Sequence, residues 1–249
     1  MADPSSPVPL VPATAAGLGL AALLCILGPP LVALLWRRRT GAPWRAFGWG
    51  AAVFLVFQVV LRFPWQLPLA RWANGHPEWM TPFIVFSSFT AGLFEETGRW
   101  VGYRTVLRNE RNPRAGAMFG LGHGGLEAIL LAGLPFVGLL VAWGMAASGK
   151  LSSAPALAAI RQQTHDLGFF TAQLAVLERA SAMAMHVGLA LIVLQCFTRR
   201  SLGWLFLAIL IHAGVDTAGV LIAGRIGRWV EIPIAALGVA VLLLGVRLA

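Results

Sequence analysis

Long apolar runs dominate this sequence and constrain its fold more than any other feature. An α-helix needs about 20 consecutive, mostly apolar residues to cross a bilayer. Runs of that kind can be drawn at 10–36, 45–63, 79–107, 114–147, 168–197, 201–223 and 229–248. Only 12% of the residues are charged, about half the share found in a soluble domain. The sequence therefore predicts an all-α, polytopic transmembrane bundle of about seven spans, within a range of six to eight, that forms a single domain over 1–249.

Proline, glycine and arginine mark the places where these helices are expected to break or end. The Gly-Leu-Pro sequence at 133–135 interrupts the fourth run and predicts a broken helix or two shorter ones. The Arg-Phe-Pro-Trp sequence at 62–65 predicts the end of the second helix. Residues 148–167 form the one long loop. Three arginines at 37–39 follow the first run, the reverse of the order in a cleavable signal peptide, so we expect a permanent span there.

Basic residues are divided unevenly between the two sides of the predicted bundle. One side holds ten: Arg37, Arg38, Arg39, Arg45, Arg108, Arg111, Arg114, Arg199, Arg200 and Arg247. The other side holds six: Arg62, Arg71, Lys150, Arg161, Arg225 and Arg228. Cytoplasmic loops carry an excess of lysine and arginine, so we expect the N-terminus outside and the C-terminus in the cytoplasm. Because these short loops account for the net charge of +9, we expect no nucleic-acid partner.

Ionisable side chains inside the apolar runs are the second feature that the fold must accommodate. They are Glu95, Glu96, Glu127, Glu178 and Asp216, together with His123, His186 and His212. A charge at the centre of a transmembrane helix costs about 2.5–3.5 kcal/mol on insertion scales, so such residues usually mark a functional site. We therefore expect one polar site inside the bundle.

The spacing of these residues places them on shared helix faces and at one depth. His123 and Glu127 are four residues apart, as are His212 and Asp216, so each pair shares a face. Counted from the arginine-rich loops, Glu96 and the three histidines lie nine to thirteen residues into their helices. At 1.5 Å per residue this is roughly 14–20 Å from that surface. The depth favours access from the cytoplasmic side.

Three histidines with several carboxylates also match the ligand set that holds zinc with an open position for water. A His-x-x-x-Glu pair alone is weak evidence, because it can be a simple hydrogen-bonded pair. Two such pairs beside a Glu-Glu-x-x-Arg segment at the same depth are more specific. The cofactor that this set predicts is Zn²⁺ or another divalent metal.

Several short motifs resemble those of a known group of membrane enzymes. Glu-Glu-Thr-Gly-Arg at 95–99, Phe-Gly-Leu-Gly-His at 119–123 and His-Ala-Gly-Val-Asp at 212–216 resemble, in order, three motifs of the CAAX protease and bacteriocin-processing (CPBP) superfamily. The closer resemblance is to the YhfC-type branch of intramembrane metalloproteases. It includes Gly-His-Gly-Gly-Leu-Glu-Ala-Ile at 122–129 and the Glu178-Arg179 pair with His186. The resemblance extends from about 83 to 216, within a motif-bearing core of about 79–223.

The resemblance implies hydrolysis of a peptide bond in a membrane-associated substrate by a glutamate-activated water. It implies Glu95 or Glu96 as the general base. Neighbours on a helix point about 100° apart, so one should face the site and the other should pair with Arg99 or Arg104. Arg99 follows the second glutamate by three residues, where the wider superfamily usually has four.

The histidines take the remaining roles that the resemblance implies. His123 and His212 are the first candidates to ligate a metal or, in a metal-free version, to hold the water and stabilise the oxyanion. The residues that would complete the ligand shell or orient these histidines are His186, Glu127 and Asp216. Asp216 stands where prenyl-protein proteases usually have asparagine. Glu178 and Arg179 are either supporting site residues or a structural ion pair.

Three other functional classes use similar residues. A proton- or metal-coupled transporter would favour an inverted repeat, and no repeat is visible in the sequence. A di-histidine haem protein would lack the carboxylates beside its histidines, and a non-catalytic adaptor would retain the site as a relic. We therefore expect an intramembrane metalloprotease of a bacterial cell membrane. Its partners would be membrane lipid and a membrane-associated protein or peptide substrate.

Overall fold

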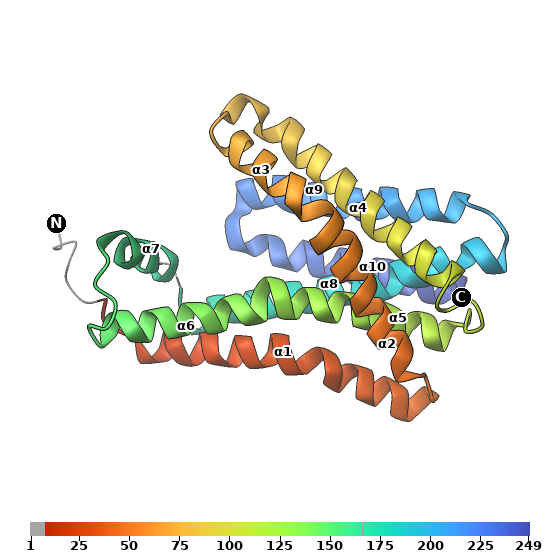
Figure 1. The fold of residues 1–249 in the computed structure, drawn as a ribbon, viewed down its shortest axis with the longest axis horizontal. Helices are drawn as coiled ribbons and strands as arrows, with labels where there is room; N and C mark the ends of the chain where they lie inside the picture. Colours follow the sequence, from red (N-terminus) through yellow and green to blue (C-terminus); the bar gives the residue numbers. More distant parts are fainter. Residues whose placement is uncertain (1–7, 166) are drawn as a thin grey trace.

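The chain folds into a bundle of long helices (Figure 1). The computed structural model describes residues 8–165 and 167–249, and within these residues there is no β-strand. Uninterrupted long helices are α1 (Pro12–Thr40), α4 (Met80–Arg104), α8 (Phe169–Thr198), α9 (Gly203–Ile226) and α10 (Glu231–Leu248). Two composite helices are α2 (Trp44–Phe54), η1 (Leu55–Arg62) and α3 (Phe63–Asn74), and α5 (Pro113–Ala128), η3 (Ile129–Gly133) and α6 (Leu134–Ala147). The short connecting elements are η2 (Pro77–Trp79), α7 (Ala154–Thr164) and η4 (Gly227–Val230).

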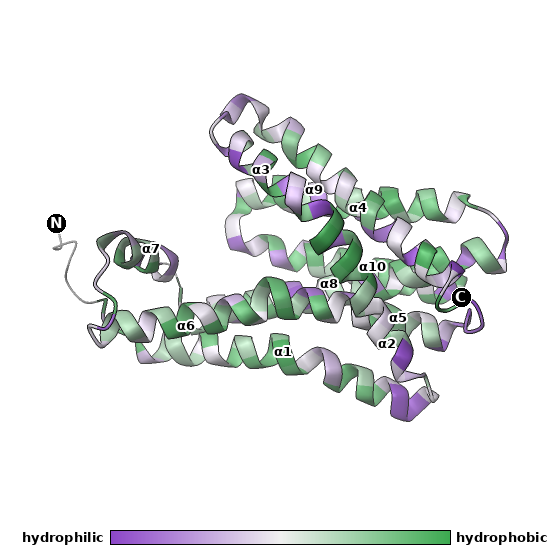
Figure 2. Cartoon of the chain, in the orientation of Figure 1, coloured by the Kyte–Doolittle hydropathy of each residue, from purple (hydrophilic) through white to green (hydrophobic). Residues whose placement is uncertain are grey.

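The helices are those of an integral membrane protein. Among the described residues, five stretches are long and apolar enough to cross a membrane: Pro12–Thr40, Trp44–Asn74, Pro113–Ala147, Phe169–Thr198 and Gly203–Leu248. The last stretch turns back at η4, so it supplies two antiparallel helices, α9 and α10 (Figure 1). Helix α4 is 25 residues long but carries three charged residues in its interior. Each predicted run thus corresponds to a long helical segment, and the predicted all-α membrane bundle is confirmed. Figure 2 shows mostly hydrophobic residues along the helices, with hydrophilic ones at the loops and at some interior helix positions.

Both predicted helix interruptions are π-helical segments inside continuous helices. Segments η1 and η3 each lead into a helix with a proline in its first turn, Pro64 or Pro135. At these junctions the N–H groups of Phe63 and Leu134 bond to the carbonyl five residues earlier. Proline lacks an N–H and crowds the carbonyl four residues before it, and the wider turn accommodates both effects. The predicted end of the second helix at 62–65 is therefore wrong, and 113–147 is one continuous helix.

The long loop predicted at 148–167 contains helix α7. Ser153 precedes this helix, and Pro155 lies in its first turn, where a missing N–H costs nothing. Leu157 and Ile160 are buried in a cluster with Trp143 of α6. The prediction of a simple loop is wrong. Leu157 and Ile160 are three residues apart, so they share one helix face, and that face packs in this cluster.

The antiparallel helices give the bundle two ends. The C-terminal ends of α1, α4, α8 and α10 lie with the N-terminal ends of α2, α5 and α9 (Figure 1). We call this the arginine-rich end (residues 37–45, 105–114, 199–202 and 247–249), since it carries all ten basic residues of the first side. The opposite end comprises residues 75–79, 148–165, 167–168 and 227–230. At the arginine-rich end Gly41 terminates α1 in the left-handed conformation, φ 72°.

Apolar side chains close the bundle toward the arginine-rich end. Tyr103, Leu107, Met118, Phe119 and Leu189 from α4, α5, α8 and the turn after α4 are fully buried in one cluster. The Tyr103 hydroxyl donates a hydrogen bond to the backbone carbonyl of residue 190 at 2.9 Å, which links α4 to α8. Buried apolar side chains therefore fill the space between α4, α5 and α8 at this end of the bundle.

Helix α5 approaches its neighbours at backbone distance because glycines face them. A Cβ atom on Gly122 would lie 1.9 Å from the carbonyl oxygen of Phe47 in α2. On the other side, a Cβ on Gly120 would lie 2.6 Å from the Cα of Val187 in α8. Helix α5 is thus held between α2 and α8, and this contact fixes the backbone position of His123, which follows Gly122 directly.

We expect Gly122→Ala to lower the free energy of unfolding by about 2 kcal/mol or more, since the added methyl group forces two backbones apart. Gly138→Ala in α6 is the matched control, because nothing lies within 4 Å of a Cβ there. Alanine is also the better helix former at such a site. Unfolding in detergent, followed by circular dichroism, compares the two variants. Equal stability of both would contradict the close contact of α2 and α5.

Candidate functional site

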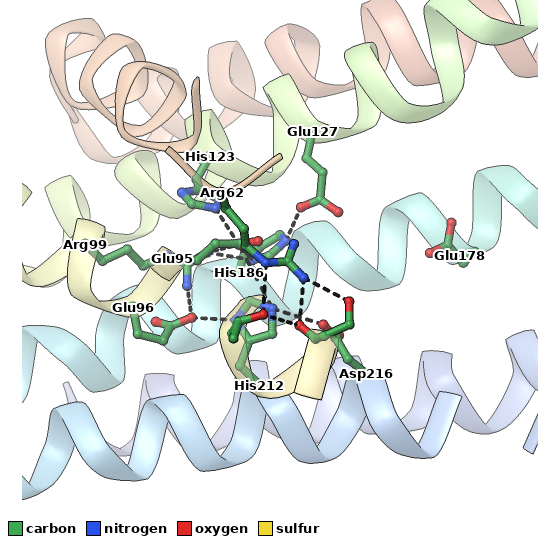
Figure 3. A network of polar contacts seen from close by, with 12 residues as sticks. Arg62, Glu95, Glu96, Arg99, His123, Glu127, Glu178, His186, His212 and Asp216 are labelled. Carbon is green, nitrogen blue, oxygen red and sulfur yellow. Dashed lines mark hydrogen bonds and ion pairs between the residues drawn. The ribbon is translucent and has the colours of Figure 1, made fainter. Parts of the chain in front are cut away.

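Glu95 lies at the centre of a buried cluster of polar side chains (Figure 3). Its Oε2 accepts a hydrogen bond from Nε2 of His123 at 2.8 Å. The same oxygen is 4.0 Å from Nδ1 of His186 and 4.0 Å from Nε2 of His212. It also lies 3.7 Å from Nη2 of Arg99. Histidines from α5, α8 and α9 thus surround one carboxylate oxygen from α4.

Glu96, the neighbouring residue, makes a different set of contacts. Its Oε1 pairs with Nη1 of Arg99 and accepts a hydrogen bond from Nδ1 of His212 at 2.7 Å. On the other side of the His212 ring, Nε2 is 3.5 Å from Oδ2 of Asp216. The two glutamates thus differ in their nearest partners: Glu95 contacts His123, whereas Glu96 pairs with Arg99 and bonds to His212.

His186 connects the cluster to a second ion-pair group. Its Nδ1 lies 2.6 Å from Nη2 of Arg99, and its Nε2 lies 2.5 Å from Oε2 of Glu127. The other oxygen of Glu127 accepts a hydrogen bond from Arg179 at 2.9 Å, and Arg179 also pairs with Glu178. Glu127 is thus hydrogen-bonded to His186 on α8, while His123, its neighbour on α5, bonds to Glu95.

The hydrogen-bond partners assign the proton positions on two histidines. Arginine can only donate, so Nδ1 of His186 accepts from Arg99, and Nε2 carries the proton that it shares with Glu127. On His123, Nε2 donates to Glu95. The neutral His123 ring then holds a lone pair on Nδ1, which is buried without a hydrogen-bond partner among the described residues. Such an atom is suited to ligate a cation or to accept a proton from water.

A cavity of about 530 Å³ opens beside this cluster. The cluster residues that line it are Glu95, Glu127, His186, His212 and Asp216. From there it extends to Ser88 on α4, Glu178 on α8 and Ala223 on α9, all of which lie toward the opposite end of the bundle. The depth of the polar residues in the sequence favoured access from the arginine-rich end. In the structure the buried apolar cluster lies at that end, and the cavity extends toward the opposite end.

Four side chains of this cluster can share one cation. Glu95, His123, Glu127 and His186 each offer one ligand atom, and these four atoms lie within 4.8 Å of one another. Two imidazoles and two carboxylates suit zinc, and the nitrogen of His123 that faces Glu95 is Nε2. Coordination by His186 would require it to exchange one of its present hydrogen bonds. The expected ligands His212 and Asp216 lie outside this group of four.

The cluster carries an excess of negative charge. Its carboxylates are those of Glu95, Glu96, Glu127, Glu178 and Asp216, and its guanidinium groups are those of Arg62, Arg99 and Arg179. With neutral histidines, two negative charges have no counterpart in the cluster, and such an excess is costly inside a membrane. One divalent cation would balance it, as would two protons.

The structure places two arginines differently from the sequence-based expectation. Arg104 is exposed, and its guanidinium lies 5.0 Å from the Trp100 ring, away from Glu95 and Glu96. Arg62, expected in a loop, is buried in η1 and lines the cavity. The missed signal was the spacing of Gln58, Arg62 and Gln66 by four residues, which the expected helix end at 62–65 concealed.

Comparison with known proteins connects this site to a family. The model of the family described as YhfC intramembrane metalloprotease matches residues 20–236. The uncharacterized membrane protein YhfC of Bacillus subtilis (strain 168) is 32% identical over 206 residues, which cover 77% of this chain and 79% of the relative. No solved structure matches the chain. The matched range includes every residue of the cluster, and the chain belongs to the YhfC intramembrane metalloprotease family.

Proposed function

We propose that this protein hydrolyses peptide bonds of membrane-associated substrates, with Glu95 as the general base. The observation that carries the proposal is the position of Glu95: one of its oxygens is within 4.0 Å of three histidines and faces a cavity. The name of the family supports the same reaction. Water is scarce in a bilayer, so an enzyme there has to hold a water molecule beside a basic group.

The proposed reaction uses the two sides of the cluster differently. Glu95 takes a proton from a water in the cavity as the water oxygen attacks the carbonyl carbon of the peptide. His212 lies between Glu96 and Asp216, and in its doubly protonated form it donates from Nδ1 to Glu96 and from Nε2 to the oxyanion. The C–N bond then breaks, and the proton that Glu95 took leaves with the amine. Arg99 positions the site because it contacts both Glu96 and His186.

We further propose that Zn²⁺ or another divalent metal would be held by Glu95, His123, Glu127 and His186. A bound divalent metal polarises a carbonyl oxygen and makes water a better nucleophile. In that version one carboxylate oxygen of Glu95 would hold the metal and the other would remain to accept a proton. In the metal-free version, His123 orients Glu95 and the two excess negative charges are neutralised by protons.

The metal content of the purified protein separates these versions. We expect about one equivalent of divalent metal per chain, as for a single-zinc site. The His123→Ala variant should lose nearly all of this metal. His76→Ala is the control, since His76 lies near the opposite end and stacks on Trp72. Elemental analysis of protein purified without added metal gives the ratio. Absence of metal from the wild-type protein would contradict metal assistance and favour the glutamate-only version.

Hydrolysis itself is tested in proteoliposomes that contain a library of membrane-spanning peptides. Cleavage in ¹⁸O-labelled water should place ¹⁸O in each new C-terminal carboxylate, which mass spectrometry detects. The same vesicles, loaded with a pH- or metal-sensitive dye, test the alternative of a proton- or metal-coupled transporter. Ion flux without new peptide termini would replace the protease proposal with the transporter.

We also propose that the arginine-rich end faces the cytoplasm, with the N-terminus outside and the C-terminus inside. This end carries the larger share of basic residues. The burial of Arg62 strengthens the asymmetry because it removes one charge from the opposite end. In this orientation the cavity leads from Glu95 toward the extracytoplasmic side.

A further inference from the structure

Arg62 is a buried cation on the wall of the cavity. It is the last residue of the π segment η1, and only 4% of its surface is exposed. Its Nη2 donates to the carbonyl and hydroxyl oxygens of Ser87 at 2.7 and 3.0 Å, and its Nε donates to the hydroxyl of Thr90 at 3.3 Å. All of these acceptors are neutral. They hold the guanidinium against α4 without balancing its charge.

The two arginines that line the cavity have different environments. Arg179 contacts carboxylate oxygens of both Glu127 and Glu178. For Arg62, no carboxylate oxygen lies within 4.0 Å among residues 8–165 and 167–249. Glu95 and Asp216 line the same cavity and attract Arg62 only at longer range. A guanidinium in this setting has an unused donor group, and a charge without a direct partner is costly in low dielectric.

The surroundings of Arg62 form a polar strip beside the proposed base. Gln58, Arg62 and Gln66 follow one another at four-residue spacing and all line the cavity. Gln66 donates to the Ser87 hydroxyl at 3.1 Å, and Oε1 of Gln58 is buried without a hydrogen-bond partner among the described residues. Within the described chain, the strip therefore offers a guanidinium donor without a hydrogen bond and an amide acceptor without one, beside the cavity that Glu95 also lines.

We propose that Arg62 binds a carboxylate of the peptide substrate, so that the enzyme prefers peptides with a negative charge close to the scissile bond. The inference rests on the proposed peptide hydrolysis. The carboxylate is the free C-terminus or an acidic side chain, and both present the same two oxygens to a guanidinium. The Gln58 carbonyl accepts a backbone N–H of the same peptide. The π segment aims Arg62 at this position, as such segments often do at functional sites.

The charges of the cavity favour a carboxylate over a lipid phosphate. Besides Arg62 and the paired Arg179, the ionisable groups lining the cavity are Glu95, Glu127, Glu178, His186, His212, Asp216 and Glu231. A phosphate with several oxygens would meet these carboxylates, with one unpaired guanidinium to balance the repulsion. A planar carboxylate matches a single guanidinium in both charge and shape.

Equilibrium binding of short fluorescent peptides in detergent tests the proposal without relying on turnover. The probes are dansyl-Leu-Ala-Leu-Leu with a free carboxylate or a carboxamide terminus, and dansyl-Leu-Ala-Glu-Leu amide beside its Gln analogue. Mass spectrometry verifies that the probes stay intact. One charge-assisted hydrogen bond predicts about tenfold or tighter binding of the charged member of a pair. A difference within the first pair identifies the C-terminus as the carboxylate that Arg62 binds. A difference within the second pair identifies an acidic side chain.

Arg62→Gln should abolish the discrimination, and Arg62→Lys should restore part of it. Arg71→Gln is the matched control, since Arg71 is an exposed residue of α3 beyond the cavity. If the wild-type protein binds both members of each pair equally, the proposal is overturned whether or not the variants fold. If discrimination is found but no peptide is hydrolysed, the protease function fails and the anion site stands. Tighter binding of anionic lipid vesicles that depends on Arg62 would instead assign it to phosphate and overturn the peptide proposal.

Discussion

Glu95→Gln is expected to lower the rate of peptide hydrolysis by about 10³-fold, in the range for loss of a general base, while the protein still folds. Glutamine has nearly the same shape, and its carbonyl oxygen can still accept the hydrogen bond from His123 that Glu95 accepts at 2.8 Å. It cannot take a proton from water. Burial of a neutral amide in place of a carboxylate also reduces the negative excess of the cluster, so the stability of the bundle should not fall.

The control for this variant is Glu231→Gln, because Glu231 lines the same cavity at the start of α10 and touches none of the cluster histidines. Initial rates of cleavage in proteoliposomes compare the two variants with the wild-type protein. Retention of more than a tenth of the wild-type rate by Glu95→Gln would show that another group is the base. Glu96→Gln would then be the next candidate, although its carboxylate pairs with Arg99.

Arg99→Met is expected to be the most destabilising single change, with a loss of about 3–5 kcal/mol in the free energy of unfolding. Arg99 is fully buried and contacts Glu96 and His186 directly, with Glu95 at 3.7 Å. Its removal leaves Glu96 charged in the bilayer without its cationic partner. Methionine fills a similar volume, so most of the loss reports charge and hydrogen bonding.

A double-mutant cycle isolates this interaction. Glu96→Gln in the Arg99→Met background should recover about 1–3 kcal/mol, because the unpaired charge is removed. The same second change in the wild-type background should be destabilising, since Glu96 also accepts a hydrogen bond from His212. Steric-trapping or denaturant unfolding in detergent gives the four values. Purely additive values would show that Arg99 and Glu96 act independently in the folded protein.

The helices could be predicted because apolar length is a property of the sequence itself. Each run drawn from composition corresponds to a helical segment, and the four-residue spacings placed His123 and His212 correctly on inward faces. One helix boundary was predicted wrongly. Pro64 suggested a helix end, because a proline usually terminates an α-helix. The chain instead continues through a π segment, whose last residue, Arg62, donates a hydrogen bond to Ser87 of α4.

The pairings inside the cluster could be predicted only in part, for a similar reason. Spacing within one helix shows which side chains share a face, as for His123 and Glu127. It does not show which of them meets a neighbouring helix, and Glu127 bonds to His186 on α8. Arg62 was missed because a charged residue near a proline is typical of a loop. Its burial is set by acceptors on α4, 25 residues away in the sequence.

The apolar packing at the arginine-rich end has a consequence for the cell that contains this protein. A wet, charged cavity in a membrane endangers the ion gradient if water continues to the other face. Here Tyr103 lies one turn beyond Arg99 on α4, Phe119 one turn before His123 on α5, and both are fully buried. Between the polar cluster and the arginine-rich end, α4 and α5 therefore place buried aromatic rings, which oppose a continuous column of water. A bundle built in this way can hold charged groups inside the bilayer while the membrane stays an electrical insulator.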